Sequence, residues 1–233
     1  MTADVTRHLA LALDLDDLEA ARRLARDLRP HFAVAKVGLE LFSSAGPDAI
    51  GALAELGYDV FADLKLHDIP TTVAKAATVL GSWGARYLTV HTAGGLDVLR
   101  AGNEAFLTGA AEAGRDDAAV LAVTVLTSDG PEAAAAVPER VRLALDAGCG
   151  GIVCAAAEAA AARAVGPDLT ILTPGIRPAG TPAHDQARPA TPRAALDAGA
   201  DLLVIGRAVT AAPDPVAAAA ALVADLAGGG TAR

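Results

Sequence analysis

The sequence alternates between short apolar runs and longer amphipathic segments along almost its whole length. The longer segments, such as 16–29 and 71–84, space their apolar residues three and four apart, which is typical of helices with one buried face. The apolar runs have the length of buried strands. They occupy residues 8–14, 32–38, 59–65, 86–91, 120–126, 151–156, 169–175 and 202–207.

Eight strand–helix units within 233 residues predict the α/β class and a (β/α)8 barrel, the TIM barrel. An open doubly wound sheet is the alternative. It is disfavoured because "LDLDD" follows the first run, where a dinucleotide-binding sheet carries a glycine-rich turn. No Ser- or Pro-rich linker divides the chain, so we expect one domain over 1–233, with 228–233 as a flexible tail.

Polar residues gather at the carboxyl ends of the expected strands. In a barrel these ends meet at one rim, where the active sites of this fold lie. Polar residues from this many separate strands are hard to explain as exposed loop residues, and they therefore predict an active site. They are Asp14, Lys36, Asp63, Lys65, Asp68, His91, Thr127, Ser128 and Arg207.

The third run ends in "DLKLHDIP", which holds four ionisable residues within six positions. Side chains alternate along a strand, so Asp63 and Lys65 share a face, and the leucines beside them suit the helix layer. We therefore expect both charged groups to point into the barrel. A purely structural Asp–Lys pair is the alternative, but Asp14 and Lys36 fit the same interior and favour a site that handles a negative charge and a proton.

Composition narrows the class of function. The formal net charge is −9 and no basic cluster stands out, so a nucleic-acid partner is not expected. Cys149 and Cys154 have no further Cys or His at zinc-binding spacing, and we expect reduced, buried thiols. No apolar run approaches the length of a membrane span, and the N-terminal "LALAL" is too short for a secretion signal, so a cytoplasmic protein without a membrane partner is expected.

Taken together, the motifs resemble those of the orotidine 5′-phosphate decarboxylase family, in its compact bacterial form. The Asp-x-Lys-x-x-Asp core is shared with sister barrels, whereas "HDIP", "TPGIRP" and "IGR" together are more specific. The resemblance runs along the whole chain. It is carried by "LALDLDD", "KVGLELF", "DLKLHDIPTTV", "HTAGG", "VTVLTS", "TPGIRP" and "VIGRAVT".

The resemblance implies conversion of orotidine 5′-monophosphate to uridine 5′-monophosphate and CO2 in pyrimidine biosynthesis, without metal or cofactor. It implies that Lys65 stabilises a carbanion at C6 and then protonates it, while Asp63 lies against the substrate carboxylate. Asp14 and Lys36 would hold ribose hydroxyls and complete the alternation of charge. Asp68, which is also implied in catalysis, and Thr72 resemble positions that reach into the neighbouring subunit's site, which implies a homodimer with shared active sites.

A phosphate site is expected at the loops after the seventh and eighth strands, where barrel enzymes often bind phosphate. Gly206 allows close approach of the backbone and Arg207 offers a fork of donors. The Pro- and Gly-rich segment 174–190, which holds Arg177 and Gln186, has the length of a lid that closes over the phosphate. Arg177 and Arg207 could instead be solvated surface charges. The implied substrate-binding residues are Asp14, Lys36, Asp63, Ile69, Thr72, Thr127, Ser128, Pro174, Arg177, Gln186, Gly206 and Arg207.

Two other functions stay open at this point. One is a metal-dependent aldolase or decarboxylase of a sister phosphate-binding barrel, which needs carboxylates placed for Mg²⁺. Glu40 could be offered as one such ligand, but no convincing second carboxylate accompanies the core pair. The other is a binding-only nucleotide barrel. It would need a broken set of charges, and here all four members are present.

Overall fold

The structure, a computed structural model, describes residues 5–126, 131–178 and 190–228. Within them, parallel strands close into a barrel in which each strand pairs with the next and β8 pairs with β1. This ring confirms the predicted (β/α)8 fold and excludes the open sheet. The strands are β1 (Leu9–Leu13), β2 (Val34–Val37), β3 (Asp59–Leu66), β4 (Tyr87–His91), β5 (Ala119–Val123), β6 (Gly151–Val153), β7 (Thr170–Thr173) and β8 (Leu202–Ile205).

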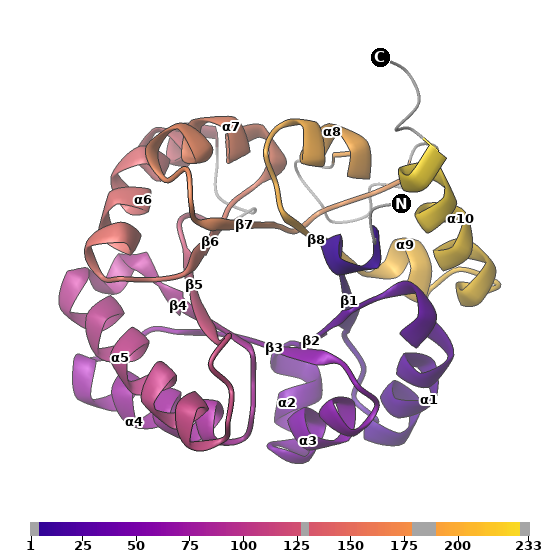
Figure 1. The fold of residues 1–233 in the computed structure, drawn as a ribbon, viewed down its shortest axis with the longest axis horizontal. Coiled ribbons are helices and arrows are strands. Elements are labelled where there is room, and N and C mark those ends of the chain that lie inside the picture. Colours follow the sequence, from indigo (N-terminus) through magenta and orange to yellow (C-terminus); the bar gives the residue numbers. More distant parts are fainter. Residues whose placement is uncertain (1–4, 127–130, 179–189, 229–233) are drawn as a thin grey trace.

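Helices surround the strand ring (Figure 1). The α-helices are α1 (Leu18–Leu28), α2 (Leu39–Ala45), α3 (Asp48–Glu55), α4 (Pro70–Ser82), α5 (Leu96–Glu112), α6 (Val137–Asp146), α7 (Ala156–Val165), α8 (Pro192–Asp197), α9 (Arg207–Thr210) and α10 (Pro215–Gly228). Short 3-10 helices are η1 (Val5–His8), η2 (Arg29–His31), η3 (Thr92–Gly94) and η4 (Pro131–Ala136). None of the described helices is long and apolar enough to cross a membrane.

The alternation of residues in each strand builds two apolar layers. In β1 the leucines Leu9, Leu11 and Leu13 belong to the large cluster between strands and helices, whereas Ala10 and Ala12 belong to a separate cluster inside the ring. The small alanines leave room in a narrow interior that larger side chains from other strands fill. The inner cluster is Ala10, Ala12, Val34, Phe61, Leu121, Val123, Val153, Leu172, Leu202 and Val204.

Several strands end earlier than the apolar runs. The fifth run was expected to reach residue 126, but β5 ends at Val123, and the Thr124 hydroxyl then donates to the carbonyl of Val153. The sixth run was expected to reach residue 156, but β6 ends at Val153. After β5 the apolar residues Val125 and Leu126 line a cavity, whereas Cys154 and Ala156 after β6 pack in the cluster between strands and helices. The C-terminal helix extends to Gly228, which is the first residue of the expected tail, and 229–233 lie outside the described residues.

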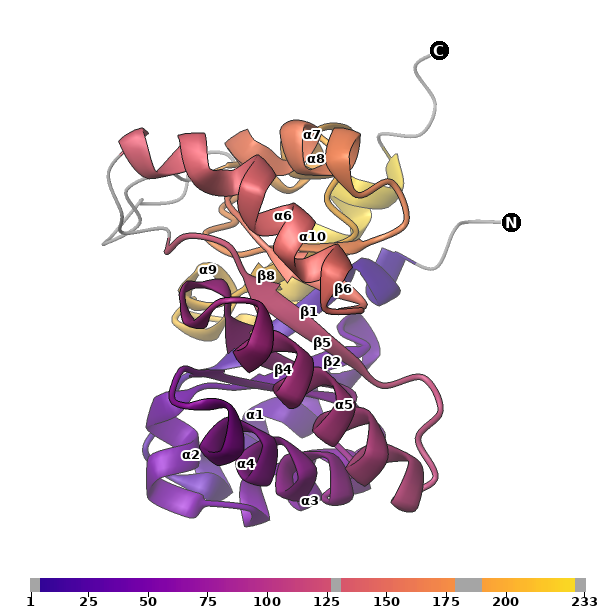
Figure 2. The same ribbon diagram turned by 90° about the vertical axis from the view of Figure 1, so that its left-hand side faces the viewer.

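Helices α4 and α5 pack side by side along the outer wall (Figure 2). Two glycines allow this contact. A Cβ built on Gly81 would lie 2.4 Å from the carbonyl oxygen of Phe106, and one on Gly109 would lie 2.1 Å from that of Thr78. Both obstacles are backbone atoms of the opposite helix, so neither position has room for a side chain. The position of α4, which begins directly after the charged loop of β3, is therefore fixed by α5.

The two cysteines are free thiols and both are buried, as the sequence predicts. Burial raises the pKa of the Cys149 thiol to about 12. A thiol with so high a pKa is a poor nucleophile, because the thiolate is the reactive form. Cys149 is therefore poorly suited to act as a nucleophile.

Candidate active site

The end of β3 is irregular where its charged residues lie. Ala62 pairs with Leu88 and Leu66 pairs with Val90, so residues 63–65 of β3 lie opposite Thr89 alone. Lys65 has a φ of 49°, and it is the one non-glycine residue with positive φ among the described residues. Such a backbone costs roughly 1–2 kcal/mol for an L-residue. Strain of this kind at a polar strand end is typical of functional sites.

Four charged side chains form an alternating chain across β1, β2 and β3. The ammonium of Lys36 lies 2.9 Å from Asp14 Oδ1 and 3.7 Å from Asp63 Oδ2. Lys65 Nζ in turn donates to Asp63 Oδ1 at 2.7 Å. The side chains of Lys36 and Asp63 are only 10% and 15% exposed, so the inner members of the chain are withdrawn from water. The expectation that these four groups meet inside the ring agrees with this geometry.

Gly38 makes room for the outer pair. A Cβ at this position would lie 2.8 Å from Lys36 Nζ and 2.9 Å from Asp14 Oδ1. Any side chain there would push the two charges apart. Gly38 was not among the site residues predicted from the sequence, although it follows directly after Val37 at the end of β2.

The charged chain separates two cavities of different character. One, of about 170 Å³, reaches Lys36, Asp63 and Lys65 and is otherwise mostly apolar. Its remaining lining is Val123, Val125, Leu126, Val153, Leu172, Pro174 and Val204. The second, of about 190 Å³, also reaches Lys36 and Asp63, and adds polar groups from the loops after β7 and β8. Together they can hold a ligand that has one flat, weakly polar part and one strongly polar part.

Two guanidinium groups face the second cavity. Arg177 and Arg207 both line it, with Pro174, Gly175 and Gly206. Arg177 is 7% exposed, and its Nε has no hydrogen-bond partner within the described residues. Burial, and second the positive charge of Arg207, lower the pKa of the Arg177 guanidinium. An anion between the two groups would relieve both the repulsion and the lost hydration, so this end of the site is suited to a phosphate.

The backbone of Arg177 is anchored at the base of the long loop. Its N–H donates to the carbonyl of Ala190 at 2.9 Å, and Ile176 and Ala190 form a parallel bridge. The described ends of segment 174–190 therefore lie side by side. Gln186, which the sequence analysis places in the lid, and Thr127 and Ser128, which it places at the pyrimidine, lie outside the described residues.

Comparison with known proteins identifies the family. The profile described as "Orotidine 5'-phosphate decarboxylase / HUMPS family" matches residues 7–222. The chain belongs to this family.

The relatives that were found agree with this assignment to the orotidine 5′-phosphate decarboxylase family. Proteins named orotidine 5′-phosphate decarboxylase from Thermobifida fusca (strain YX) and Anaeromyxobacter sp. (strain K) are 50% and 48% identical to the chain. The first comparison covers 94% of this chain and 95% of the relative, and the second 95% and 99%. A crystal structure of orotidine 5′-phosphate decarboxylase from Lactobacillus acidophilus has a TM-score of 0.77 at 36% identity, covering 93% of this chain and 97% of that one.

The resemblance to the family places Asp68 and Thr72 at the site of a neighbouring subunit, and Ile69 among the substrate-binding residues. Asp68 and Ile69 lie in the loop from β3 to α4, and Thr72 lies in the first turn of α4. Asp68, Ile69 and Thr72 are all exposed, and Ile69 has 66% of its surface accessible. The carboxylate of Asp68 accepts the N–H of Ile69 at 2.7 Å. Within the described residues of this chain, none of the three lines either cavity.

Thr89 in β4, which was not predicted from the sequence, lies directly beneath the charged chain. Its hydroxyl oxygen accepts the backbone N–H of Lys65 at 2.8 Å and donates to Asp63 Oδ1 at 3.1 Å. The side chain is fully buried. One signal was available, because Thr89 is a hydroxyl residue in the middle of the otherwise apolar run "YLTV".

Proposed function

We propose that this chain decarboxylates orotidine 5′-monophosphate to uridine 5′-monophosphate and CO2 in pyrimidine biosynthesis. The observation that carries the proposal is the alternating chain Asp14–Lys36–Asp63–Lys65 beside a cavity that ends in two arginines. Relatives with 48–50% identity over nearly the whole chain bear the name of this enzyme. The polar cavity suits the phosphate, and the largely apolar one suits the pyrimidine ring.

Lys65 and Asp63 carry the chemical step in this proposal. The bond from C6 to the carboxylate breaks, its electron pair stays on C6, and a proton from Lys65 Nζ forms the new C–H bond. Asp63 lies against the substrate carboxylate. Two like charges about 4 Å apart repel by roughly 4 kcal/mol at an effective dielectric of 20, and this repulsion disappears as neutral CO2 leaves. The attraction to Lys65 grows as negative charge develops at C6, so the enzyme favours the transition state over the substrate.

The remaining site residues bind the nucleotide. Arg207, Arg177 and the Gly206 backbone hold the phosphate, and Asp14 and Lys36 hold the ribose hydroxyls. By similarity to the family, Thr127, Ser128, Pro174 and Gln186 contact the base and close the site. Binding energy from the phosphate supports the reaction at C6, because contacts far from the reacting atoms can be used to hold the substrate in its reactive position.

The proposed reaction needs neither a metal nor a cofactor, in contrast to a metal-dependent sister enzyme. The relatives named above favour the decarboxylase, and Glu40, the ligand considered for a metal, is exposed at the start of α2. The test is to add orotidine 5′-monophosphate to the purified protein in the presence of excess chelator and to follow the ultraviolet absorbance of the pyrimidine. We expect full turnover. Loss of turnover that Mg²⁺ restores, or no turnover with or without the metal, would contradict the proposal.

We further propose a homodimer with shared active sites. Ile69 and Leu39, at the same rim as the charged chain, expose 66% and 60% of their surfaces, and a second subunit would cover them. Asp68 and Thr72 then complete the site of the partner. We propose a cytoplasmic location as well, since pyrimidine biosynthesis supplies nucleotides there.

The dimer is tested by mixing two inactive variants. Lys65→Ala and Asp68→Asn proteins are unfolded together and refolded, so that the chains assort. A hybrid dimer has one complete site, and random assortment of equal amounts predicts about a quarter of the wild-type activity. Each variant refolded alone is the control. Activity no higher than in the controls would show that Asp68 does not act across the interface.

A further inference from the structure

Thr89 is the only residue of β4 that faces the irregular stretch of β3. Residues 63–65 lie opposite it, so the regular ladder of backbone hydrogen bonds is interrupted there. The N–H of Lys65 bonds instead to the Thr89 hydroxyl at 2.8 Å. A side-chain oxygen therefore replaces a strand carbonyl as the partner of a residue whose φ of 49° takes it out of strand geometry.

The same hydroxyl also fixes the orientation of Asp63. Its proton is directed to Asp63 Oδ1 at 3.1 Å, which already accepts Lys65 Nζ at 2.7 Å. Two donors on Oδ1 hold the carboxylate plane, and Oδ2 remains directed toward Lys36 at 3.7 Å. Thr89 is thus hydrogen-bonded to both members of the Asp63–Lys65 pair, to one through the backbone and to the other through the side chain.

Other buried threonines near this rim are satisfied differently. Thr92 donates to the carbonyl of Val123 at 2.8 Å, and Thr124 donates to that of Val153 at 2.8 Å. Backbone carbonyls are therefore sufficient to satisfy the buried hydroxyls of Thr92 and Thr124. The bonds of Thr89 to Asp63 and Lys65 are specific to its place beneath the charged chain.

We propose that Thr89 is a positioning residue for the decarboxylation, holding the β3 bulge in the conformation that sets Lys65 Nζ against Asp63. This inference rests on the function proposed above. Thr89 has no accessible surface, so it acts through Asp63 and Lys65 and not on the substrate. A displacement of about 1 Å in a reacting group can cost roughly 100-fold in rate, so the effect falls on catalysis more than on binding.

The test compares Thr89→Val, which removes the hydroxyl at nearly constant volume, with Thr89→Ser, which keeps it. We expect kcat to fall about 10- to 100-fold in the valine variant, while the affinity for uridine 5′-monophosphate stays within about threefold. The serine variant should stay within about threefold of wild type in both measurements. Thr92→Val is the matched control, because it removes a buried hydroxyl bonded to backbone carbonyls only, and its kcat should stay within about threefold.

A second measurement does not depend on activity. Hydrogen exchange of the Lys65 amide should be faster in Thr89→Val than in wild type or in Thr89→Ser, because valine removes its acceptor. If the valine variant does not fold, Thr89→Cys replaces it, since a thiol is a weak hydrogen-bonding group of similar size. Unchanged kcat in the variant that lacks the hydroxyl, or a serine variant as slow as it, would overturn the inference. Failure of the wild-type protein to decarboxylate the substrate would instead overturn the proposed function, and the exchange of the Lys65 amide would then decide the inference about Thr89.

Discussion

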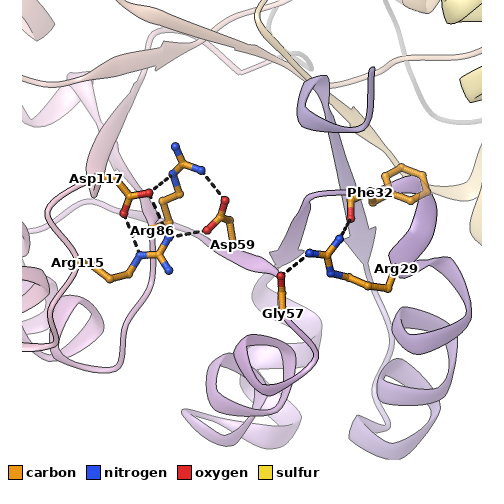
Figure 3. A network of polar contacts seen from close by, with 7 residues as sticks. All are labelled: Arg29, Phe32, Gly57, Asp59, Arg86, Arg115 and Asp117. Atoms are coloured by element: carbon orange, nitrogen blue, oxygen red, sulfur yellow. Dashed lines mark hydrogen bonds and ion pairs between the residues drawn. The ribbon is translucent and has the colours of Figure 1, made fainter. Parts of the chain in front are cut away.

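Strand β3 carries a network of two acids and two bases at each of its ends. At its start, Asp59 accepts hydrogen bonds from Arg86 and Arg115, and Asp117 lies 3.2 Å from a nitrogen of each arginine (Figure 3). At its other end, Asp63 and Lys65 join Asp14 and Lys36. Both networks alternate in charge, yet only the second borders the two cavities described above.

The bases account for much of the difference. In the lower network, formed by Asp59, Asp117, Arg86 and Arg115, each base is a guanidinium. Its planar fork contacts both carboxylates at once. Burial alone would raise the pKa of Asp59, but hydrogen bonds from Arg115 and Arg86 outweigh it and hold that pKa below its ordinary value. Such a network stabilises the fold. In the upper network, formed by Asp14, Lys36, Asp63 and Lys65, the bases are ammonium groups, which can give up a proton. The strained backbone at Lys65 sets one of these ammonium groups at the edge of a cavity.

The largest expected effect comes from removing the proton donor of the upper network. Lys65→Ala should lower kcat by about 10⁴-fold or more, the upper end for a general acid, because both the charge at C6 and its proton are lost. Decarboxylation is followed by absorbance, and binding of uridine 5′-monophosphate by calorimetry should remain measurable. Arg23→Ala, which removes an exposed charge of α1, is the control. A Lys65 variant with near-normal turnover would rule out the assigned role.

The phosphate end should show a smaller effect that depends on the ligand. Arg207→Ala should weaken uridine 5′-monophosphate binding about 10- to 100-fold, which corresponds to about 1.4–2.7 kcal/mol and is typical of a hydrogen bond to a charged group. Uridine, which has no phosphate, should bind within about twofold of wild type. Calorimetric titration of both ligands measures this. Equal weakening of the two would mean that Arg207 does not bind the phosphate.

Breaking the lower network should change stability and leave catalysis unchanged. Asp59→Asn keeps the shape of the side chain and removes the charge between two arginines, so the free energy of unfolding should fall by about 1–3 kcal/mol. Urea denaturation measures it, and kcat should stay within about twofold. Asp117→Asn is the matched control with a smaller loss, below about 1 kcal/mol, because the side chain of Asp117 is 55% exposed. A large loss of kcat in Asp59→Asn would show that the two ends of β3 are coupled.

The smallest expected effect is the pH dependence of the stabilisation that the ionised Asp59 gives to the fold. Because the pKa of Asp59 is lower in the folded than in the unfolded chain, its ionised form stabilises the fold above about pH 3.9, the ordinary carboxyl pKa. The stabilisation is lost as the pH falls through the lower folded value. The difference in unfolding free energy between wild type and Asp59→Asn should therefore be constant from about pH 7 to 5 and shrink below about pH 4. A difference that grows on acidification would contradict this account.

Periodicity and strand-end chemistry were sufficient for the barrel and for the meeting of Asp63 with Lys65. The geometry of this pair is less regular than the sequence pattern suggests. Regular alternation put both side chains on one face, whereas the structure places them there through a bulge and a left-handed residue. Such a bulge depends on what lies opposite it in the next strand, which is information that a pattern within one run does not contain.

The lower network shows the same limit. Asp59 bonds to partners 27 and 56 residues further along the chain, and each of the residues alone looks like an ordinary surface charge. Thr89 and Gly38 were missed for a similar reason, since their roles are set by neighbouring strands. The residue types that perform chemistry can be recognised in a sequence more easily than the small residues that give them room.

Gly81 and Gly109, which let α4 and α5 pack closely, limit how the position of Asp68 can change during evolution. They lock the first helix after β3 against its neighbour backbone to backbone, and the bulge fixes the other end of the same stretch. Residues 67–69 thus form a short connection between two segments whose positions are fixed. How far Asp68 projects can change only through those few positions, so substitutions elsewhere on the surface should leave the reach of this carboxylate intact.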